Sequence, residues 1–473
     1  MKRERTTFAL FFGNRGFFPP QLMEEARAEL PRILGEMGHD CLMMPADATR
    51  NGAVETPEEG ERFARFLEEN RGKYGGVVLS LPNFGDETGA VAALKDARVP
   101  ILIQAYPDTL DKMAPEVRRD AFCGKFSILD VFYQYGLKFT ALKPHTVAPS
   151  SRRFQENIRH FDAVCQVVNG LRGMTVGAIG ARTTAFKTVR IDEVALQRHG
   201  ITVETLDLSS VFARMARLEE DAACKAKKQA LLDTACWDSV PGKALDNLVR
   251  AGVVIDQLIE EFGMDALAIR CWLEFQEQLG ISPCVLLGEL NNRHIAAACE
   301  VDIGNAVAMH ALRLASYGPA TCLDWNNNYA GEDDKCILFH CGPVPKDLMV
   351  EKGQVVDHAI LANAVGPGHS YGPNVGRIAP GEMTFASMMT WEGRPRFFLG
   401  EGRFTEDPIP DDFFGCAGVA HIDHLQDVLL HIGRRGYRHH VSVTPGHLGA
   451  PVREALENYL ELEVTAPQAE RIG

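Results

Sequence analysis

Residues 8–46 read FALFFGNRGFFPPQLMEEARAELPRILGEMGHDCLMMPA and contain one complete strand–helix–strand unit. The apolar run at 8–12 predicts a buried strand. The stretch 21–38 intersperses apolar with charged residues as an amphipathic helix does, and the next strand follows from Cys41. Strands that alternate with helices in this way indicate an α/β domain built around a parallel sheet.

The same alternation continues along the chain and then begins a second series. Strand-like runs at 75–81 and 99–107 follow helix-like stretches, and GMTVGAIGAR at 173–182 opens the second series. Later parts of that series are the helix at 192–200, the strands at 201–208 and 265–271, the run 282–290, and a long helical region from Leu218 to Phe262. We therefore expect two Rossmann-like parallel-sheet domains.

Gly177 and Gly180 form a GxxG at the expected turn from strand to helix. The full GxGxxG of a dinucleotide site is missing, so these glycines favour a structural turn over a nucleotide site. After about residue 350 the pattern changes to short strand-like runs broken by Gly and Pro, among them 359–374, 383–391 and 394–404. This part predicts a smaller β-barrel-like domain, closed by a final helix at 451–463.

Charge and cysteine content exclude several classes of protein. The 473 residues include 49 Lys and Arg against 63 Asp and Glu, which gives a net charge of −14 with no strongly basic segment. An acidic surface repels phosphate backbones and anionic lipids, so we expect neither nucleic acid nor a membrane as a partner. No apolar run reaches the length of a membrane span, and 12 scattered cysteines without a CxxC pair fit reduced thiols. A cytoplasmic protein is the expectation.

The second half of the chain contains the best candidates for a metal site. Glu300 in CEVD, Asp324 in LDW, His340 in FHCG and the pair His439–His440 in HHVSV each adjoin a strand-like apolar run. Two carboxylates and one or two imidazoles that converge from strand ends suit Mn²⁺, and also Co²⁺, Fe²⁺ or Mg²⁺. The alternative role for Glu300 is that of a carboxylate at the N-terminus of a helix, where backbone amides satisfy it. Asp302 is a second candidate for that role.

These motifs, in this order, resemble the L-fucose isomerase and L-arabinose isomerase superfamily of ketol isomerases. Less specific matches lie in the N-terminal part, at 13–19, 81–87 and 121–127, and in the central part, at 177–182. They look like those of fucose isomerase-like proteins, some of which are sulfoquinovose isomerases. The resemblance implies three domains, at 1–170, 171–350 and 351–473. It also implies a homo-oligomer in which the first domain of one subunit borders the active site of a neighbour.

The resemblance further implies a divalent metal, usually Mn²⁺, held by Glu300, Asp324 and His440. His340 matches a further imidazole of arabinose isomerases. An Asp as the second acid is typical of fucose isomerases, whereas arabinose isomerases have Glu. The chain is shorter than the large bacterial fucose isomerases, so the identity of the sugar does not transfer with the chemistry.

The implied reaction interconverts an aldose and a ketose by moving a proton between C1 and C2 through a cis-enediol. Glu300 and Asp324 are expected to serve both as ligands and as the acid–base pair. Substrate hydroxyls need further polar partners, and Arg15 is the first choice, acting in trans. The other candidates are Asn83, Gln104, Lys125, Ser127, Trp272, Glu274, Asn326, Asn327, His340, His369 and Tyr371.

Two questions of function stay open at this level. The substrate is either a neutral sugar like L-fucose or D-arabinose, or the sulfosugar sulfoquinovose, whose sulfonate needs a cation such as Arg15, Lys125, Arg182 or Lys187. The competing classes are a non-catalytic sugar-binding or regulatory protein and a metal-dependent aldolase. A binding protein has no need of the Glu300, Asp324 and His440 set.

Overall fold

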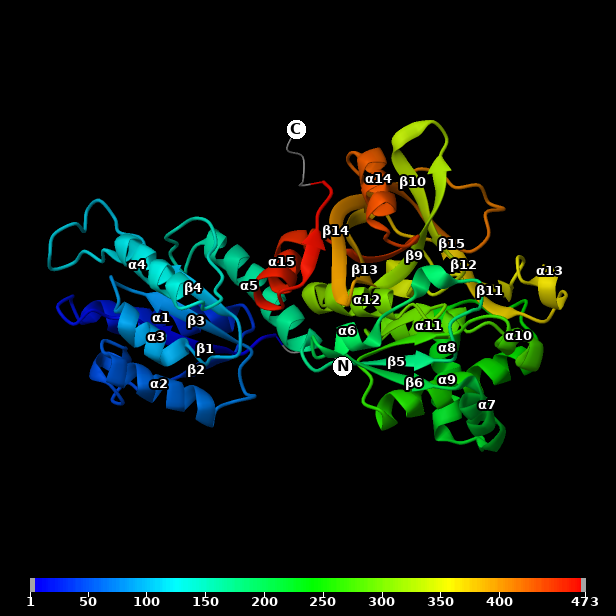
Figure 1. The fold of residues 1–473 in the computed structure, drawn as a ribbon, viewed down its shortest axis with the longest axis horizontal. Coiled ribbons are helices and arrows are strands. Elements are labelled where there is room, and N and C mark those ends of the chain that lie inside the picture. Colours follow the sequence, from blue (N-terminus) through cyan, green and yellow to red (C-terminus); the bar gives the residue numbers. More distant parts are fainter. Residues whose placement is uncertain (1–4, 469–473) are drawn as a thin grey trace. The chain divides into compact units, whose positions relative to one another are not determined.

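The computed structural model describes residues 5–468, which divide into two compact units. The first unit comprises residues 5–169 and 454–461, and the second comprises 170–453 and 462–468. Both are visible in Figure 1, where residues 5–169 of the first unit run from blue through cyan and residues 454–461 are red. Each is described here by itself.

The first unit is a four-stranded parallel sheet in the order β2-β1-β3-β4. One face is covered by α2, α3 and α4 and the other by α1 and α5, since apolar side chains of these helices share a core with alternate strand residues. The elements are β1 (Phe8–Phe12), α1 (Gln21–Glu36), β2 (Cys41–Met43), α2 (Pro57–Glu69), β3 (Gly76–Leu81), α3 (Glu87–Leu94), β4 (Ile101–Ala105), α4 (Ala121–Gln134) and α5 (Arg152–Leu171).

The second unit contains another parallel sheet, in the order β6-β5-β7-β8. Its elements are β5 (Thr175–Ile179), α6 (Glu193–Gln197), β6 (Thr202–Leu206), α7 (Leu208–Arg217), α8 (Ala222–Thr234), α9 (Gly242–Glu261), β7 (Ala266–Ile269), α10 (Glu274–Leu279), α11 (Cys284–Asn292), β8 (Ala296–Cys299) and α12 (Ile303–Ser316). Helices α7 to α11 contribute to the core on one face of this sheet.

A closed six-stranded barrel follows in the same unit, in the order β15-β10-β9-β16-β13-β14, and pairing of β14 with β15 closes it. The barrel strands are β9 (Thr321–Tyr329), β10 (Glu332–His340), β13 (Gly381–Trp391), β14 (Arg394–Phe404), β15 (Cys416–His421) and β16 (His440–Pro445). Flanking elements are β11 (Gln354–Asp357), α13 (Ala362–Val365), β12 (Tyr371–Arg377), α14 (Leu425–Arg435), α15 (Gly449–Glu454) and β17 (Glu463–Thr465). The expected fold class, two parallel-sheet α/β domains and a β-barrel, is confirmed.

The structure differs from the expected local pattern in three places. The barrel begins at Thr321 rather than near 351, so Asp324 lies on a barrel strand. Residues 362–365, expected within a strand-like run, form the short helix α13. Gly180 has a φ of +87° but leads into a loop, and α6 starts only at Glu193. The three-part division at 1–170, 171–350 and 351–473 stays a prediction.

Helix α12 lies between the second sheet and the barrel, in contact with β5, β7 and β8 and with β9, β13 and β16. Twelve of its residues are buried, because both of its sides face protein. Gly304, in its first turn, allows this close approach: a Cβ there would lie 2.3 Å from Met388 O on β13. No helix in the described part of the chain has both the length and the apolar character of a membrane span.

Replacing Gly304 by Ala should therefore destabilise the protein, although Ala normally favours a helix interior by up to about 1 kcal/mol over Gly. The added methyl meets backbone that cannot move aside, and such overpacking costs about 1–3 kcal/mol. The measurement is the calorimetric Tm. The matched control is Gly433→Ala in α14, where nothing lies within 4 Å of the new Cβ. A Tm for Gly304→Ala at or above that of the control would contradict this packing.

Candidate metal centre

Three polar side chains, two at the ends of β8 and β16 and one within β9, lie near one another in the second unit. Glu300 follows β8 directly, Asp324 lies on β9, and His440 is the first residue of β16. The ladder between β16 and β9 pairs His440 with Asp324. His440 Nε2 lies 2.8 Å from Glu300 Oε2 and 3.4 Å from Asp324 Oδ1. The structure thus brings together the acids and the imidazole that were singled out from the sequence.

The backbone at Glu300 has an unusual conformation. Glu300 and Val301 have φ values of +60° and +58°, in the left-handed region that side-chain-bearing residues rarely adopt. Such strain is typical of functional sites, because the surrounding structure must hold it in place. Here Val301 N donates to Ile269 O, and Asp302 N donates to Cys299 O. The tight turn directs the Glu300 carboxylate to His440 rather than to the start of α12.

Asp302 takes the capping role that the sequence left open. It is the N-cap of α12, and its Oδ1 accepts from Asn305 N at 3.0 Å. The same buried carboxylate accepts hydrogen bonds from Arg438 Nη1 and, at 2.7 Å, from His440 Nδ1. Asp302 therefore links the end of the sheet to the beginning of β16.

This contact determines which nitrogen of His440 is available. Because Nδ1 donates its proton to Asp302, the neutral ring carries its lone pair on Nε2, the atom that faces Glu300 and Asp324. A carboxylate that fixes the tautomer of a ligating histidine is a recurrent feature of metal sites. His440 is therefore oriented as a metal ligand is.

A fit to a cation is also indicated by atoms that lack hydrogen-bond partners. Glu300 Oε2, Asp324 Oδ1 and His440 Nε2 are all buried, and none makes a hydrogen bond of acceptable geometry. Ligand atoms about 2.1 Å from a common ion lie about 3 Å apart in octahedral geometry, near the 2.8 and 3.4 Å that separate His440 Nε2 from Glu300 Oε2 and from Asp324 Oδ1. Two carboxylates and a neutral imidazole carry a charge of −2, which a divalent cation balances. The residues present fit a divalent metal ion.

Electrostatics of the group without an ion are consistent with this fit. Burial raises the pKa of Glu300, but its contact with His440 outweighs burial and leaves the pKa below its usual value. Burial lowers the pKa of His440, but the Asp302 and Glu300 carboxylates raise it well above its usual value. Burial also raises the pKa of Asp302, and the nearby Arg438 and His440 lower it further than burial raises it. The site favours positive charge between its acids.

Aromatic side chains form one wall of the group. Trp272 Nε1 donates to Glu300 Oε1 at 3.2 Å, which holds the second oxygen of that carboxylate. The ring of Phe186 lies 5.8 Å from the ring of Trp272 and 5.3 Å from that of His439, edge-on in both cases. His439 is 39% exposed, whereas His440 is 1% exposed, so His440 is the inward member of the pair.

His340 ends β10 beside this group. One of its ring nitrogens lies within 4.8 Å of ligand atoms of Glu300 and His440. Its Nδ1 accepts the backbone N–H of Cys341 at 2.9 Å, so in the neutral ring Nε2 carries the proton. This tautomer makes His340 a hydrogen-bond donor rather than a ligand.

The candidates in the first unit belong to other networks. Asn83 is fully buried, donates to Asn14 and accepts from Arg15 N at 3.2 Å. The Arg15 guanidinium donates to Gly85 O at 2.8 Å and pairs with Glu87. These residues follow β1 and β3, as expected for the carboxyl edge of a parallel sheet. Their role in binding substrate stays a prediction.

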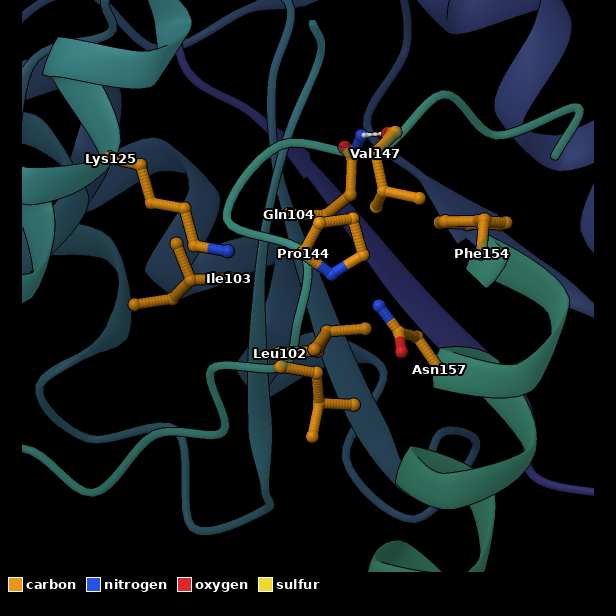
Figure 2. A pocket seen from close by; sticks show the side chains of 9 residues that line it. Leu102, Ile103, Gln104, Lys125, Pro144, Val147, Phe154 and Asn157 are labelled. Atoms are coloured by element: carbon orange, nitrogen blue, oxygen red, sulfur yellow. Dashed lines mark hydrogen bonds between the residues drawn. The ribbon is translucent and has the colours of Figure 1, made fainter. Parts of the chain in front are cut away.

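Figure 2 shows Gln104 and Lys125 around a cavity of about 10 Å³, which has room for about one water molecule and not for a sugar. Gln104 Nε2 donates to Val147 O and its Oε1 accepts from Ser80 Oγ, so both amide atoms are engaged. Lys125 donates to His145 O, and burial lowers its pKa to about 8. Ser127 lies two residues further along α4.

The remaining candidates of the second unit lie on or near its surface. His369 and Tyr371 line a separate surface pocket, none of whose lining residues belongs to the Glu300 group. Glu274 pairs with Arg270, and Asn326 and Asn327 are exposed on β9. Arg182 and Lys187 are exposed on the loop that carries Phe186.

Sequence reasoning missed Arg438 and the second role of Asp302. Asp302 carried a visible signal, since an acid before an apolar helix predicts an N-cap. Its contact with His440, 138 residues away, has no local signal.

The chain is similar to known sugar isomerases in two separate regions. A family model described as "Fucose/sulfoquinovose isomerase, N-terminal domain" matches residues 9–172. A second, "L-fucose isomerase, C-terminal domain", matches residues 338–467 and includes His340 and His440. Among solved structures, an ABC transporter periplasmic solute binding protein from Actinobacillus succinogenes with bound D-allose aligns at a TM-score of 0.18 and 12% identity, over 66% of this chain and 93% of that one. So low a score supports no structural argument.

Curated relatives carry the name sulfoquinovose isomerase. The protein from Priestia aryabhattai is 23% identical over 60% of this chain and 62% of its own length. The protein from Alkalicoccus urumqiensis is 29% identical over 59% of this chain and 61% of its own length. The matched region thus spans about three fifths of these relatives. With both family models matched in order along one chain, the protein belongs to the fucose isomerase-like superfamily.

Proposed function

We propose that the protein is a Mn²⁺-dependent aldose–ketose isomerase of a monosaccharide, with Glu300, Asp324 and His440 as the metal ligands. The observation that carries the proposal is the position of the buried His440 Nε2, which lies 2.8 Å from Glu300 Oε2 and 3.4 Å from Asp324 Oδ1, while none of the three atoms makes a hydrogen bond. Co²⁺, Fe²⁺ and Mg²⁺ suit the same oxygen and nitrogen donors. Membership in the superfamily supports the reaction class.

Isomerisation moves a proton between C1 and C2 of the sugar through a cis-enediol. A bound divalent ion polarises the carbonyl and offsets negative charge on the two adjacent oxygens. Glu300 and Asp324 are the carboxylates that accept and return the proton. The low pKa of Glu300 keeps it ionised near neutral pH, as a base must be.

The surrounding residues hold these groups in place. Asp302 orients His440, and Trp272 fixes one oxygen of Glu300 so that the other stays directed at the site. The side chains of Glu300 and Asp324 are 14% and 20% exposed, which leaves the acids open to an incoming sugar. The rings of Phe186 and Trp272 offer an apolar wall for the C–H face of a sugar. His340, which ends β10 beside the acids, is a further proposed contact for the substrate.

Sulfoquinovose is the substrate that we propose first, since the relatives carry the name sulfoquinovose isomerase. A sulfonate requires a cation, and Arg182 and Lys187 lie on the loop of Phe186, whose ring packs against His439 and His440. A neutral sugar like L-fucose or D-arabinose is the second candidate, favoured by the description of the C-terminal family model.

Arg15, Asn83, Gln104 and Lys125 remain the proposed contacts from the first unit, and His369 a further one from the second. The proposal includes a homo-oligomer in which Arg15 acts on the site of a neighbouring subunit. A cytoplasmic location is part of the same proposal.

The reaction itself is tested by incubating the protein and Mn²⁺ in D₂O with aldoses and ketoses that include sulfoquinovose, L-fucose and D-arabinose, followed by NMR. We expect interconversion of sulfoquinovose and its ketose, with solvent deuterium entering at C1 or C2. Cleavage products would indicate an aldolase. Binding of a sugar without any conversion would indicate a sugar-binding protein, and either outcome would contradict the proposal.

Glu300→Gln should lower kcat by a factor on the order of 10³ or more, because it removes a ligand charge and a proton acceptor while keeping the shape of the side chain. Glu277→Gln on α10 is the control, since that exposed acid lies outside the metal group. Activity of purified Glu300→Gln near that of the unaltered protein would rule out this assignment.

Asp302→Asn should raise the Kd for Mn²⁺ about 10- to 100-fold, as loss of an outer-shell partner of a metal ligand does. Asn still caps a helix well, so α12 should persist. What is lost is the acceptor that holds the proton on His440 Nδ1. The measurement is Mn²⁺ binding followed by electron paramagnetic resonance. The exposed Asp423→Asn serves as the control, and equal affinities in the two variants would contradict the role of Asp302.

A further inference from the structure

A pair of buried cysteines adjoins the metal group and takes no part in the proposed reaction. Cys299 is the last residue of β8, and Cys271 lies two residues beyond the end of the neighbouring β7. Their side chains are almost fully buried. The two Sγ atoms and a carboxylate oxygen of Glu300 all lie within 4.8 Å of one another.

One metal ion can bind all three donor atoms, and water can occupy its fourth coordination position. Two thiolates and a harder ligand around Zn²⁺ are a common protein arrangement, with Zn–S bonds of about 2.3 Å. His340 supports the thiolate form, because its Nε2 lies 3.3 Å from Cys299 Sγ and carries the proton in the neutral ring. An N–H donor of this kind stabilises negative charge on sulfur.

The same donors discriminate between kinds of ion. Mn²⁺ and Mg²⁺ prefer oxygen and nitrogen ligands, whereas thiolates select soft ions. The Sγ atoms of Cys271 and Cys299 therefore favour Zn²⁺ and Cd²⁺ over Mn²⁺ and Mg²⁺ at this position.

We propose that Cys271, Cys299 and Glu300 form a second metal site, which binds thiophilic divalent ions such as Zn²⁺ and Cd²⁺. Glu300 belongs to both groups, so an ion at the thiols withdraws a ligand from the Glu300, Asp324 and His440 centre. The site makes that centre sensitive to soft metals. Binding at the thiols is independent of the proposed isomerase activity, whereas the sensitivity rests on that proposal.

Another cysteine-containing group is less suited to the same ion. Asp302, Cys322 and His440 also offer ligand atoms within 4.8 Å of one another. The Asp302 carboxylate, however, already accepts hydrogen bonds from Arg438, Asn305 and His440 Nδ1. A metal there would have to break those contacts, so Cys322 provides a matched control.

The test is a titration of the full-length, reduced, metal-free protein with Cd²⁺, followed by the ultraviolet charge-transfer absorption of Cd–thiolate bonds. Cys123, which is the exposed cysteine among the described residues, is replaced by Ser in every protein of the experiment. In the Cys123→Ser protein, which serves as the background, we expect a charge-transfer absorption whose intensity corresponds to two Cd–S bonds. Cys271→Ser and Cys299→Ser should each retain at most half of it and raise the Kd for Cd²⁺ at least tenfold, whereas Cys322→Ser should match the background. An unchanged absorption in both Cys271→Ser and Cys299→Ser, or its loss in Cys322→Ser, overturns the proposal.

X-ray absorption of the Cd²⁺-loaded background protein gives an answer even if a serine variant fails to fold. Two sulfur neighbours per ion are expected, and a shell of oxygen and nitrogen alone overturns the site.

Release of bound Mn²⁺ by Cd²⁺, followed by electron paramagnetic resonance, tests the shared Glu300 separately from any turnover. Cys271→Ser should require at least tenfold more Cd²⁺ for half-release, and equal requirements contradict the coupling. A protein that fails to isomerise any sugar but shows the two-sulfur signal would refute the proposed function and leave this site standing.

Discussion

The hydrogen bonds of Asp302 hold the second unit in its functional arrangement. This buried carboxylate caps α12, which leaves the sheet after β8, and it binds Arg438 and His440 at the start of β16. Removing one partner would leave a charge buried without compensation, which costs about 3–5 kcal/mol. The sheet and the barrel are thereby fixed at the point where Glu300, Asp324 and His440 meet.

These contacts determine which atoms of His440 and Glu300 are hydrogen-bonded. One nitrogen of His440 is hydrogen-bonded to Asp302, and one oxygen of Glu300 is hydrogen-bonded to Trp272. The other nitrogen and the other oxygen face each other at 2.8 Å and make no hydrogen bond of acceptable geometry. Free buried polar atoms are costly unless something binds them. The left-handed backbone of Glu300 and Val301 adds a further cost that only a required direction of the carboxylate explains. The proposed divalent ion would offset the desolvation of these atoms and balance their charge.

Local sequence patterns predicted most of the fold because its units are local. An apolar run followed by an amphipathic stretch predicts each βα unit, as in 8–46. The acids that follow apolar runs could be predicted for the same reason, because their signal is also local. The start of the barrel at Thr321 could not be read, since its closure depends on pairing of β14 with β15 and not on the composition of one strand. Nor could the link from Asp302 to His440, which joins residues 138 positions apart. The thiol pair likewise arises from two neighbouring strand ends that sheet order alone brings together.

The proposed metal centre requires that one divalent ion is held by Glu300, Asp324 and His440. The most direct measurement is anomalous X-ray scattering at the manganese edge from crystals grown with Mn²⁺. We expect a single strong peak per chain, within bonding distance of Glu300 Oε2, Asp324 Oδ1 and His440 Nε2. A peak bound by other residues, or none at saturating Mn²⁺, would contradict it.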